Sequence, residues 1–268
     1  MKKLEHFSVY DRNPTTLCVP KGAMYIASCL TSLTFPCLST CSIDLPFDEK
    51  KCFDIIQFLA RHSTVTHLSS LIHGAFQGHQ APIVDLLPDL KHYDGSIQLL
   101  PMLSPRCRLT EVRLRWSGYD DTILPVELLD PRLPIIVSLE DYHSSDYEVQ
   151  KRTLSLLSEN MSHVASLHVR IPGRPEAHTE VLERLVKCLP RFSDLKYLAL
   201  DIPMFKPKDG KWLVPQLWAD ACPTLTACSI RHRASRKVDD GWEEYSTQEF
   251  EVEAGFSVFE SFLKRDKL

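Results

Sequence analysis

Residues 141–146 (DYHSSD) bring together acid, base and hydroxyl side chains, the types that nucleophilic catalysis uses. Such groups act together only when separate parts of a chain converge, and neighbours in one polar loop lack a scaffold that would orient them. The sequence also contains no G-x-S-x-G, no Walker A loop and no G-x-G-x-x-G. We therefore expect no catalysis and no cofactor. The alternative is a hydrolase-like enzyme with a pocket built by the loops of residues 142–146 and 231–240.

Thiol and imidazole groups that could bind a metal ion occur in the first third of the chain, at Cys37, Cys41, His62, His67, His73 and His79. A closed zinc site needs two close ligand pairs, and here the spacings supply only C-x3-C. Cys41 also falls among apolar positions, where a buried thiol serves as a small hydrophobic group. We therefore expect no metal site.

Polar residues alternate with apolar ones in several short segments, an arrangement typical of strands that expose one face. The exposed positions would be His67, His92, Glu111, Arg113, Arg115, Glu140, Ser166, His168, Arg170, Tyr197, Asp201 and Arg231. From these we predict a protein-binding, partly basic concave face made of Arg113, Arg115, His168, Arg170, Tyr197, Asp201 and Arg231. Such a face would dock an acidic or phosphorylated segment. The alternative is an ordinary solvated face of mixed charge, because acids interleave with the arginines.

Residues 231–237 (RHRASRK) form the densest basic run and could be a nuclear-localisation or nucleic-acid patch. Asp239, Asp240, Glu243 and Glu244 follow at once and offset this charge, and the net charge of the chain is −4. We therefore interpret the run as a solvated loop and expect no nucleic-acid partner.

The elements that would position these side chains repeat along the chain in the spacing apolar-x-x-apolar-x-apolar. Clear or weaker copies start at Leu4, Leu38, Val65, Leu90, Leu109, Ile135, Val164, Leu195 and Leu225. Successive starts lie 19 to 34 residues apart, and most of these distances are near the period of leucine-rich repeats, about 20–29 residues. The pattern predicts an α/β leucine-rich-repeat solenoid with irregular repeats, in which helices lie on the convex side of a curved parallel strand row.

Segments of helical period lie between these strands, at residues 51–61, 150–161, 176–189 and 215–221. We expect a single domain over residues 1–268, because no repeat can bury its apolar side chains alone. Residues 246–268 would be a C-terminal capping segment, in which Phe256, Phe259, Phe262 and Leu263 form an aromatic stripe.

The ends and composition of the 268-residue chain favour a cytoplasmic or nuclear protein. The first residues contain no apolar signal core, and the best apolar stretch, residues 23–33, is too short to span a bilayer. The nine cysteines are an odd number and scattered, as expected of reduced thiols. We expect no membrane partner.

Several segments together resemble fungal F-box/leucine-rich-repeat proteins of the mushroom lineage. The segments are residues 86–95 (LLPDLKHYDG), 109–116 (LTEVRLRW), 189–198 (LPRFSDLKYL) and 218–225 (WADACPTL), the last followed by 240–242 (DGW). The resemblance covers roughly residues 4–245. It implies a protein–protein interaction module like the substrate-recruiting repeat domain of a ubiquitin ligase, with no catalysis of its own.

The chain departs from that family in two respects. No F-box-like string precedes Leu38, so binding to the ligase adaptor is doubtful for this chain, and a pseudo-receptor without a ligase link is the alternative. In addition, Pro46, Pro172 and Pro203 stand where the family has the Asn or Cys after the strand. We therefore expect the usual side-chain ladder under the turn to be missing.

Overall fold

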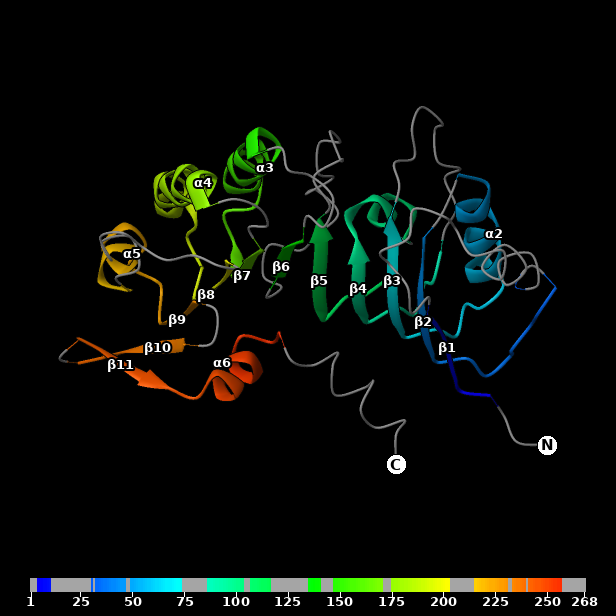
Figure 1. Cartoon of the computed structure of the whole chain (residues 1–268). Helices are drawn as coiled ribbons and strands as arrows, with labels where there is room; N and C mark the ends of the chain where they lie inside the picture. Colours follow the sequence, from blue (N-terminus) through cyan, green and yellow to red (C-terminus); the bar gives the residue numbers. More distant parts are fainter. Residues whose placement is uncertain are drawn as a thin grey trace. The chain divides into compact units, whose positions relative to one another are not determined.

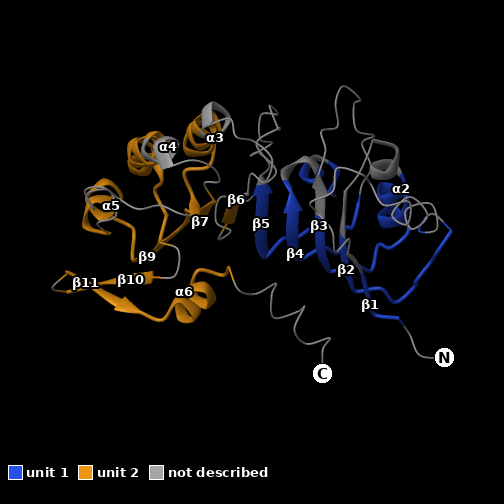
Figure 2. Cartoon of the chain, in the orientation of Figure 1, with its two compact units in different colours: residues 1–133 blue, residues 134–268 orange. Residues whose placement is uncertain are grey.

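The computed structural model describes residues 4–10, 30, 32–46, 49–73, 86–103, 107–116, 135–140, 147–170, 175–202, 215–230, 233–239 and 241–256. The chain divides into two compact units, residues 1–133 and 134–268 (Figure 2). The two units are described separately below, and the single domain expected from the sequence stays a prediction.

Unit 1 is a row of parallel strands that stand in chain order. The strands are β1 (His6–Tyr10), β2 (Thr40–Pro46), β3 (His67–His73), β4 (His92–Ser96) and β5 (Glu111–Trp116). Each strand pairs with the next one in sequence. Helix α2 (Glu49–Ala60) and the 3-10 helix η1 (Ile97–Met102) occupy the connections after β2 and β4 (Figure 1).

Unit 2 repeats this plan and then changes direction. Its parallel strands are β6 (Ile135–Glu140), β7 (Val164–Arg170), β8 (Tyr197–Asp201) and β9 (Ala227–Ile230). The connecting helices are α3 (Tyr147–Asn160), α4 (Pro175–Cys188), η3 (Leu189–Arg191) and α5 (Pro215–Ala221), and α3, α4 and α5 lie along one side of the strands (Figure 1). An antiparallel pair, β10 (Arg233–Val238) and β11 (Gly241–Tyr245), and helix α6 (Thr247–Glu253) complete the unit.

The apolar positions of the repeated pattern form the core, as predicted. Leu38, Leu195 and Leu198 are completely buried, and the same holds for the inward positions of the other described repeats, with few exceptions. Leu4 is one exception: it is 44% exposed, although it precedes its strand by two residues as Leu38 and Leu195 do. Within each unit, the strands and the helices on one side share a dry interior, which is the architecture of a leucine-rich-repeat solenoid.

Hydroxyl side chains link successive repeats just before the strands begin. Thr66 Oγ1 donates to the carbonyl oxygen of Ser39 at 3.2 Å, and Thr226 Oγ1 donates to that of Lys196 at 3.0 Å. Thr110, which precedes β5, makes the same contact to the carbonyl oxygen of Lys91 at 3.2 Å, beside a backbone hydrogen bond from its own N–H at 2.7 Å. These hydroxyl contacts connect neighbouring repeats through the residue that precedes each of these strands.

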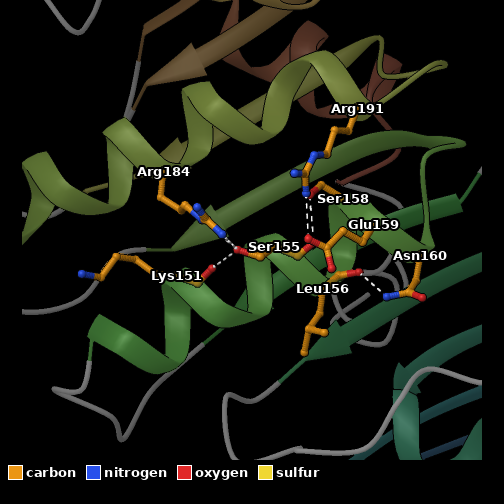
Figure 3. A network of polar contacts seen from close by, with 8 residues as sticks. All are labelled: Lys151, Ser155, Leu156, Ser158, Glu159, Asn160, Arg184 and Arg191. Carbon is orange, nitrogen blue, oxygen red and sulfur yellow. Dashed lines mark hydrogen bonds and ion pairs between the residues drawn. The ribbon is translucent and has the colours of Figure 1, made fainter.

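Helices α3 and α4 of unit 2 are joined by a seam of polar contacts (Figure 3). Lys151, Ser155 and Glu159 follow one another at four-residue spacing on α3, so they line one edge of that helix. Two contacts join α3 to α4, Lys151–Glu180 at 2.8 Å and Arg184 Nε to Ser155 Oγ at 2.7 Å. A third, Arg191–Glu159 at 2.8 Å, joins α3 to η3, which follows α4 directly. This seam keeps the two helices in register on the side of the unit away from its open strand face.

The described part of the basic run at residues 231–237 is a strand and not the loop that the sequence suggested. It belongs to β10 (Arg233–Val238), which pairs antiparallel with the acidic β11. Arg236 Nε lies 2.6 Å from Glu243 Oε1 of the facing residue, and both side chains remain about half exposed, so the charges pair across the strands at a solvated surface. Acidic residues that follow the run in the sequence therefore do offset its positive charge, and they do so across the strand pair.

Candidate functional site

We call the strand face opposite the helices the open face, and define it separately in each unit. In unit 1 its side chains form rows across the strands, because the parallel register aligns every second residue. One row contains Thr40, His67, His92 and Glu111, and the next contains Ser42, Ser69, Asp94 and Arg113. The residues expected on a concave face in this part of the chain therefore do lie side by side.

His67 and His92 stack on one another at the centre of the first row. Their ring centroids are 4.2 Å apart and the planes differ by 10°. Glu111 Oε2 lies 3.2 Å from His92 Nδ1, and Thr66 Oγ1 lies 2.8 Å from His67 Nδ1, so both rings are held in place. Partial burial, followed by the charge of His92, lowers the pKa of His67 below its ordinary value of 6.5. The stacked pair is thus a flat, partly exposed imidazole surface.

An ion pair connects Asp94 of the second row with Arg115, which lies two residues beyond Arg113 on β5. Asp94 is 0% exposed and accepts two hydrogen bonds from Arg115, from Nε at 2.9 Å and from Nη2 at 2.8 Å. This fork-to-carboxylate geometry fixes the guanidinium, 22% of whose side chain remains exposed. Arg113 is only 6% exposed. The two arginines expected to form a basic strip are therefore present on the face, but one is paired and the other is buried.

Gly95, within β4, leaves space between this strand and β3. A Cβ at this position would lie 2.6 Å from the carbonyl oxygen of Ser70 and 2.7 Å from Tyr93 Oη. Without it, Tyr93 packs fully buried and donates a 2.5 Å hydrogen bond to the Ser96 carbonyl, and burial raises its pKa well above the ordinary value. Any side chain at Gly95 would push β3 and β4 apart beneath the histidine pair.

The open face of unit 2 carries small and apolar side chains instead. Ala199, Ala227 and Ala234 lie on it, on three neighbouring strands. Ala227 and Ala234 are buried in a cluster with Phe250 and Ala254 of the C-terminal segment, against which Tyr197, Ala199, Tyr245 and Phe256 pack. Helix α6 therefore lies on this face, on the opposite side of the strands from α3, α4 and α5 (Figure 1).

Local signals in the sequence define both ends of α6. Ser246 Oγ accepts a hydrogen bond from the N–H of Glu249 at 3.5 Å, as in a capping box. At the other end Gly255 has φ +75°, its N–H donates to Val252, and the N–H of Phe256 donates to the Glu251 carbonyl at 2.8 Å. This is a Schellman motif, which turns the chain so that Phe256 returns to the strands.

The remaining residues predicted for the binding face do not form one basic surface. Two of them, His168 and Tyr197, lie against the C-terminal segment. His168 Nδ1 and Ser138 Oγ share a hydrogen bond of 3.1 Å. The centroid of the His168 ring lies 5.6 Å from that of the Phe256 ring. Tyr197 packs edge-on against Phe250 at 6.2 Å, and burial raises its pKa. Both residues are therefore contacted by the C-terminal segment.

Arg170 and Asp201 lie in a row nearer the ends of their strands and pair with each other at 3.5 Å, with side chains 39% and 46% exposed. Arg231 lies outside the described residues, as do residues 141–146 and part of 231–240, from which the alternative enzyme pocket would be built. The described face is therefore a set of paired charges and packed rings.

Two residues considered as metal ligands have structural roles. His62 is 2% exposed; its Nε2 accepts from the N–H of Phe35 at 2.8 Å, and its Nδ1 lies 2.6 Å from the Phe58 carbonyl. Cys41 is completely buried, and that burial raises the pKa of its thiol to about 12, which confirms its place in the core. Within the described ranges there is no group of three or more His, Cys, Asp or Glu residues arranged to hold a metal ion. Among the same residues, no helix is long and apolar enough to cross a bilayer.

Sequence reasoning missed Asp94 and helix α6. Asp94 lies in the middle of a weak copy of the repeat. The register with β5 places it beside Arg113, and its ion pair is with Arg115, two residues further along that strand. The signal for α6 was the set of alanines at outward strand positions, which leave room for a second layer.

Parallel strands in chain order, with connecting helices on one side, define the class of this protein as a leucine-rich-repeat solenoid. No family model matches the chain, and no curated protein matches it. Among solved structures it is similar to the leucine-rich repeat-containing protein LegL7 from Legionella pneumophila. The identity is 12% and the TM-score 0.33, over 89% of this chain and 92% of the other. This similarity is too low to carry an argument, so the class rests on the strand order and the buried repeat positions.

Proposed function

We propose that this protein is an interaction module that binds a segment of a protein partner on the open face of unit 1. The supporting observation comes from unit 2, where the corresponding face is occupied by a peptide segment, helix α6. The fold can thus hold a short segment on the side of its strands away from the helices. In unit 1 that face presents the half-buried His67, His92, Glu111 and Arg115 among its described residues.

The chemistry of this face suits a segment with hydrogen-bonding and planar groups. The stacked imidazoles offer a flat surface, and Glu111 offers carboxylate oxygens beside it. Arg115 is the group that an acidic or phosphorylated residue would contact, by sharing the guanidinium fork with Asp94. A partner with one such residue next to an aromatic or amide side chain therefore fits better than a uniformly acidic one.

The finer proposal is that the bound protein is a substrate for ubiquitin ligation. It follows from the resemblance of residues 86–116 and 189–225 to F-box/leucine-rich-repeat proteins. Recovery of the ligase adaptor together with the partner would support it. Recovery of the partner alone would leave an interaction module without a ligase link.

The test is crosslinking from the full chain with a photoreactive amino acid placed at His92, followed by identification of the captured proteins. The matched control carries the same group at Gln57, which is exposed on α2 on the other side of unit 1. We expect a protein captured from position 92 and not from position 57, with at least about tenfold less capture after Arg115→Gln. Equal capture from both positions would contradict the proposal.

A further inference from the structure

We propose that the open face of unit 2 is a helix-binding surface, and that α6 is a built-in occupant which leaves to admit a similar helix from a protein partner. This goes beyond the proposed function, because it concerns different strands and the two proposals can fail separately.

The contact is shaped for a helix. Alanines at positions 199, 227 and 234 form the floor, and Phe250 and Ala254 of α6 are buried against it, 1% and 2% exposed. The rings of Tyr197 and Tyr245 meet Phe250 edge-on, with centroids 6.2 and 6.4 Å away. Small residues under a helix permit close approach, and aromatic walls fix its position across the strands.

The far end of the segment reaches the first strand of the unit. Gly255 lies so close to Ile136 that a Cβ there would be 2.6 Å from its Cδ1. Phe256 then packs 5.6 Å from His168 and 5.9 Å from Phe250. Eleven residues, 246–256, therefore cross the face from β11 to β6 with contacts at both ends.

The contact is separable from the core of the unit. That core lies on the other side of the strands, where Leu198 and Leu200 point. Helix α6 has seven residues, and isolated helices of this length are unstable in water, so its structure depends on the contact. Its outward side is exposed and acidic, at Glu249, Glu251 and Glu253. Segments held by few buried side chains open at a much lower free energy than the core.

The residues by which α6 contacts the open face of unit 2 indicate which residues a competing segment needs. A competing segment would be a short helix with an aromatic residue and a small residue four positions later, followed by a glycine turn and a second aromatic, as Phe250, Ala254, Gly255 and Phe256 are arranged. Acidic residues at the positions of Glu249 and Glu253 would lie near Arg236, which in the present structure contacts Tyr245 and Glu243.

The experiment uses the full chain with Phe250→Ala, and a synthetic peptide of residues 246–256 as the probe. The methyl groups of Ala199, Ala227 and Ala234 report occupancy by NMR, because aromatic rings above them shift their resonances. We expect the variant to lose these shifts, to exchange the amides of α6 at least about tenfold faster, and to leave the amides of β7 and β8 protected. Added peptide should restore the methyl shifts in the variant, at an affinity at least about tenfold higher than for the unchanged chain.

Val252→Ala is the matched control, since Val252 lies on the same helix and is 61% exposed; it should change none of these readings. Gly255→Val provides a second route, because the positive φ and the contact with Ile136 oppose a side chain there. A peptide with Ala in place of Phe250 should not restore the shifts. Loss of protection in β7 and β8 together with α6, in both variants, would show that α6 belongs to the core, and failure of the peptide to restore the shifts would equally overturn the proposal.

Discussion

The open faces of the two units are built on the same strand pattern and carry opposite kinds of side chain. In unit 1 the rows hold imidazoles, carboxylates and guanidinium groups, among them the buried Asp94–Arg115 pair. In unit 2 the central rows hold alanines and rings, with Phe250 seated on them. The inward positions of both units are alike, because Leu114 and Leu198 are both completely buried.

This difference shows that the repeat constrains only one side of each strand. The inward positions must be apolar, since neighbouring repeats bury a common core. The outward positions are free to hold a charge network, as in unit 1, or to accept a second apolar layer, as in unit 2. Function in this fold therefore depends on the outward residues, which the repeat pattern leaves unspecified.

The largest effect is expected where the two units are alike. We predict that Leu114→Ala and Leu198→Ala each lower the free energy of unfolding by about 2–5 kcal/mol, the cost of a cavity at a buried leucine. Urea denaturation of the two variants, with Val252→Ala as an exposed control, measures this. A loss below about 0.5 kcal/mol for either leucine would mean that its unit lacks the shared core.

A smaller effect should distinguish the charges of the two faces. Asp94→Asn removes the charge that faces Arg115 at a completely buried carboxylate, and we expect a loss of about 2–3 kcal/mol. Asp201→Asn breaks a pair with Arg170 in which both side chains are more than a third exposed, so it should cost less than about 1 kcal/mol. Equal losses in urea denaturation would contradict the view that only the ion pair of unit 1 is built into the structure.

The sequence predicted the inward positions of the strands well, but it predicted the surroundings of the outward positions poorly. Burial at Leu38, Leu195 and Leu198 follows from local alternation, which neighbouring residues already determine. The same alternation placed Arg113 on the open face but could not predict its near-complete burial, because depth depends on the side chains of adjacent strands.

The position of the C-terminal aromatics shows the same limit. Of the predicted stripe only Phe256 lies within the described residues; Phe259, Phe262 and Leu263 do not. Phe250, which was not part of that prediction, packs on the side of the sheet away from the main core, where Ala199 and Ala227 leave space. That match joins residues far apart in the chain. Single-sequence periodicity cannot detect it, whereas the strand register shows it directly.

The smallest effect concerns the histidine pair, which has no counterpart in the central rows of unit 2. Partial burial and the neighbouring charges of His92, His6 and Lys91 lower the pKa of His67, while Glu111 opposes them. The folded chain therefore binds this proton less readily than the unfolded chain does. The stabilising contribution is fully present above the unfolded value of 6.5 and is lost as the pH falls below it.

We predict that, as the pH is lowered from about 7.5 to about 5.5, the His67→Gln variant loses less of its free energy of unfolding than the unchanged chain does. Urea denaturation at each pH measures this. The comparison cancels the titration of the other histidines, which both proteins share. Glu111→Gln should have the opposite effect and steepen the loss, because it removes the carboxylate that favours the charged imidazole. Identical pH profiles for all three proteins would mean that the stacked rings titrate independently of their surroundings. The polar rows of unit 1 would then be a solvated surface, with no greater organisation than the exposed Arg170–Asp201 pair of unit 2.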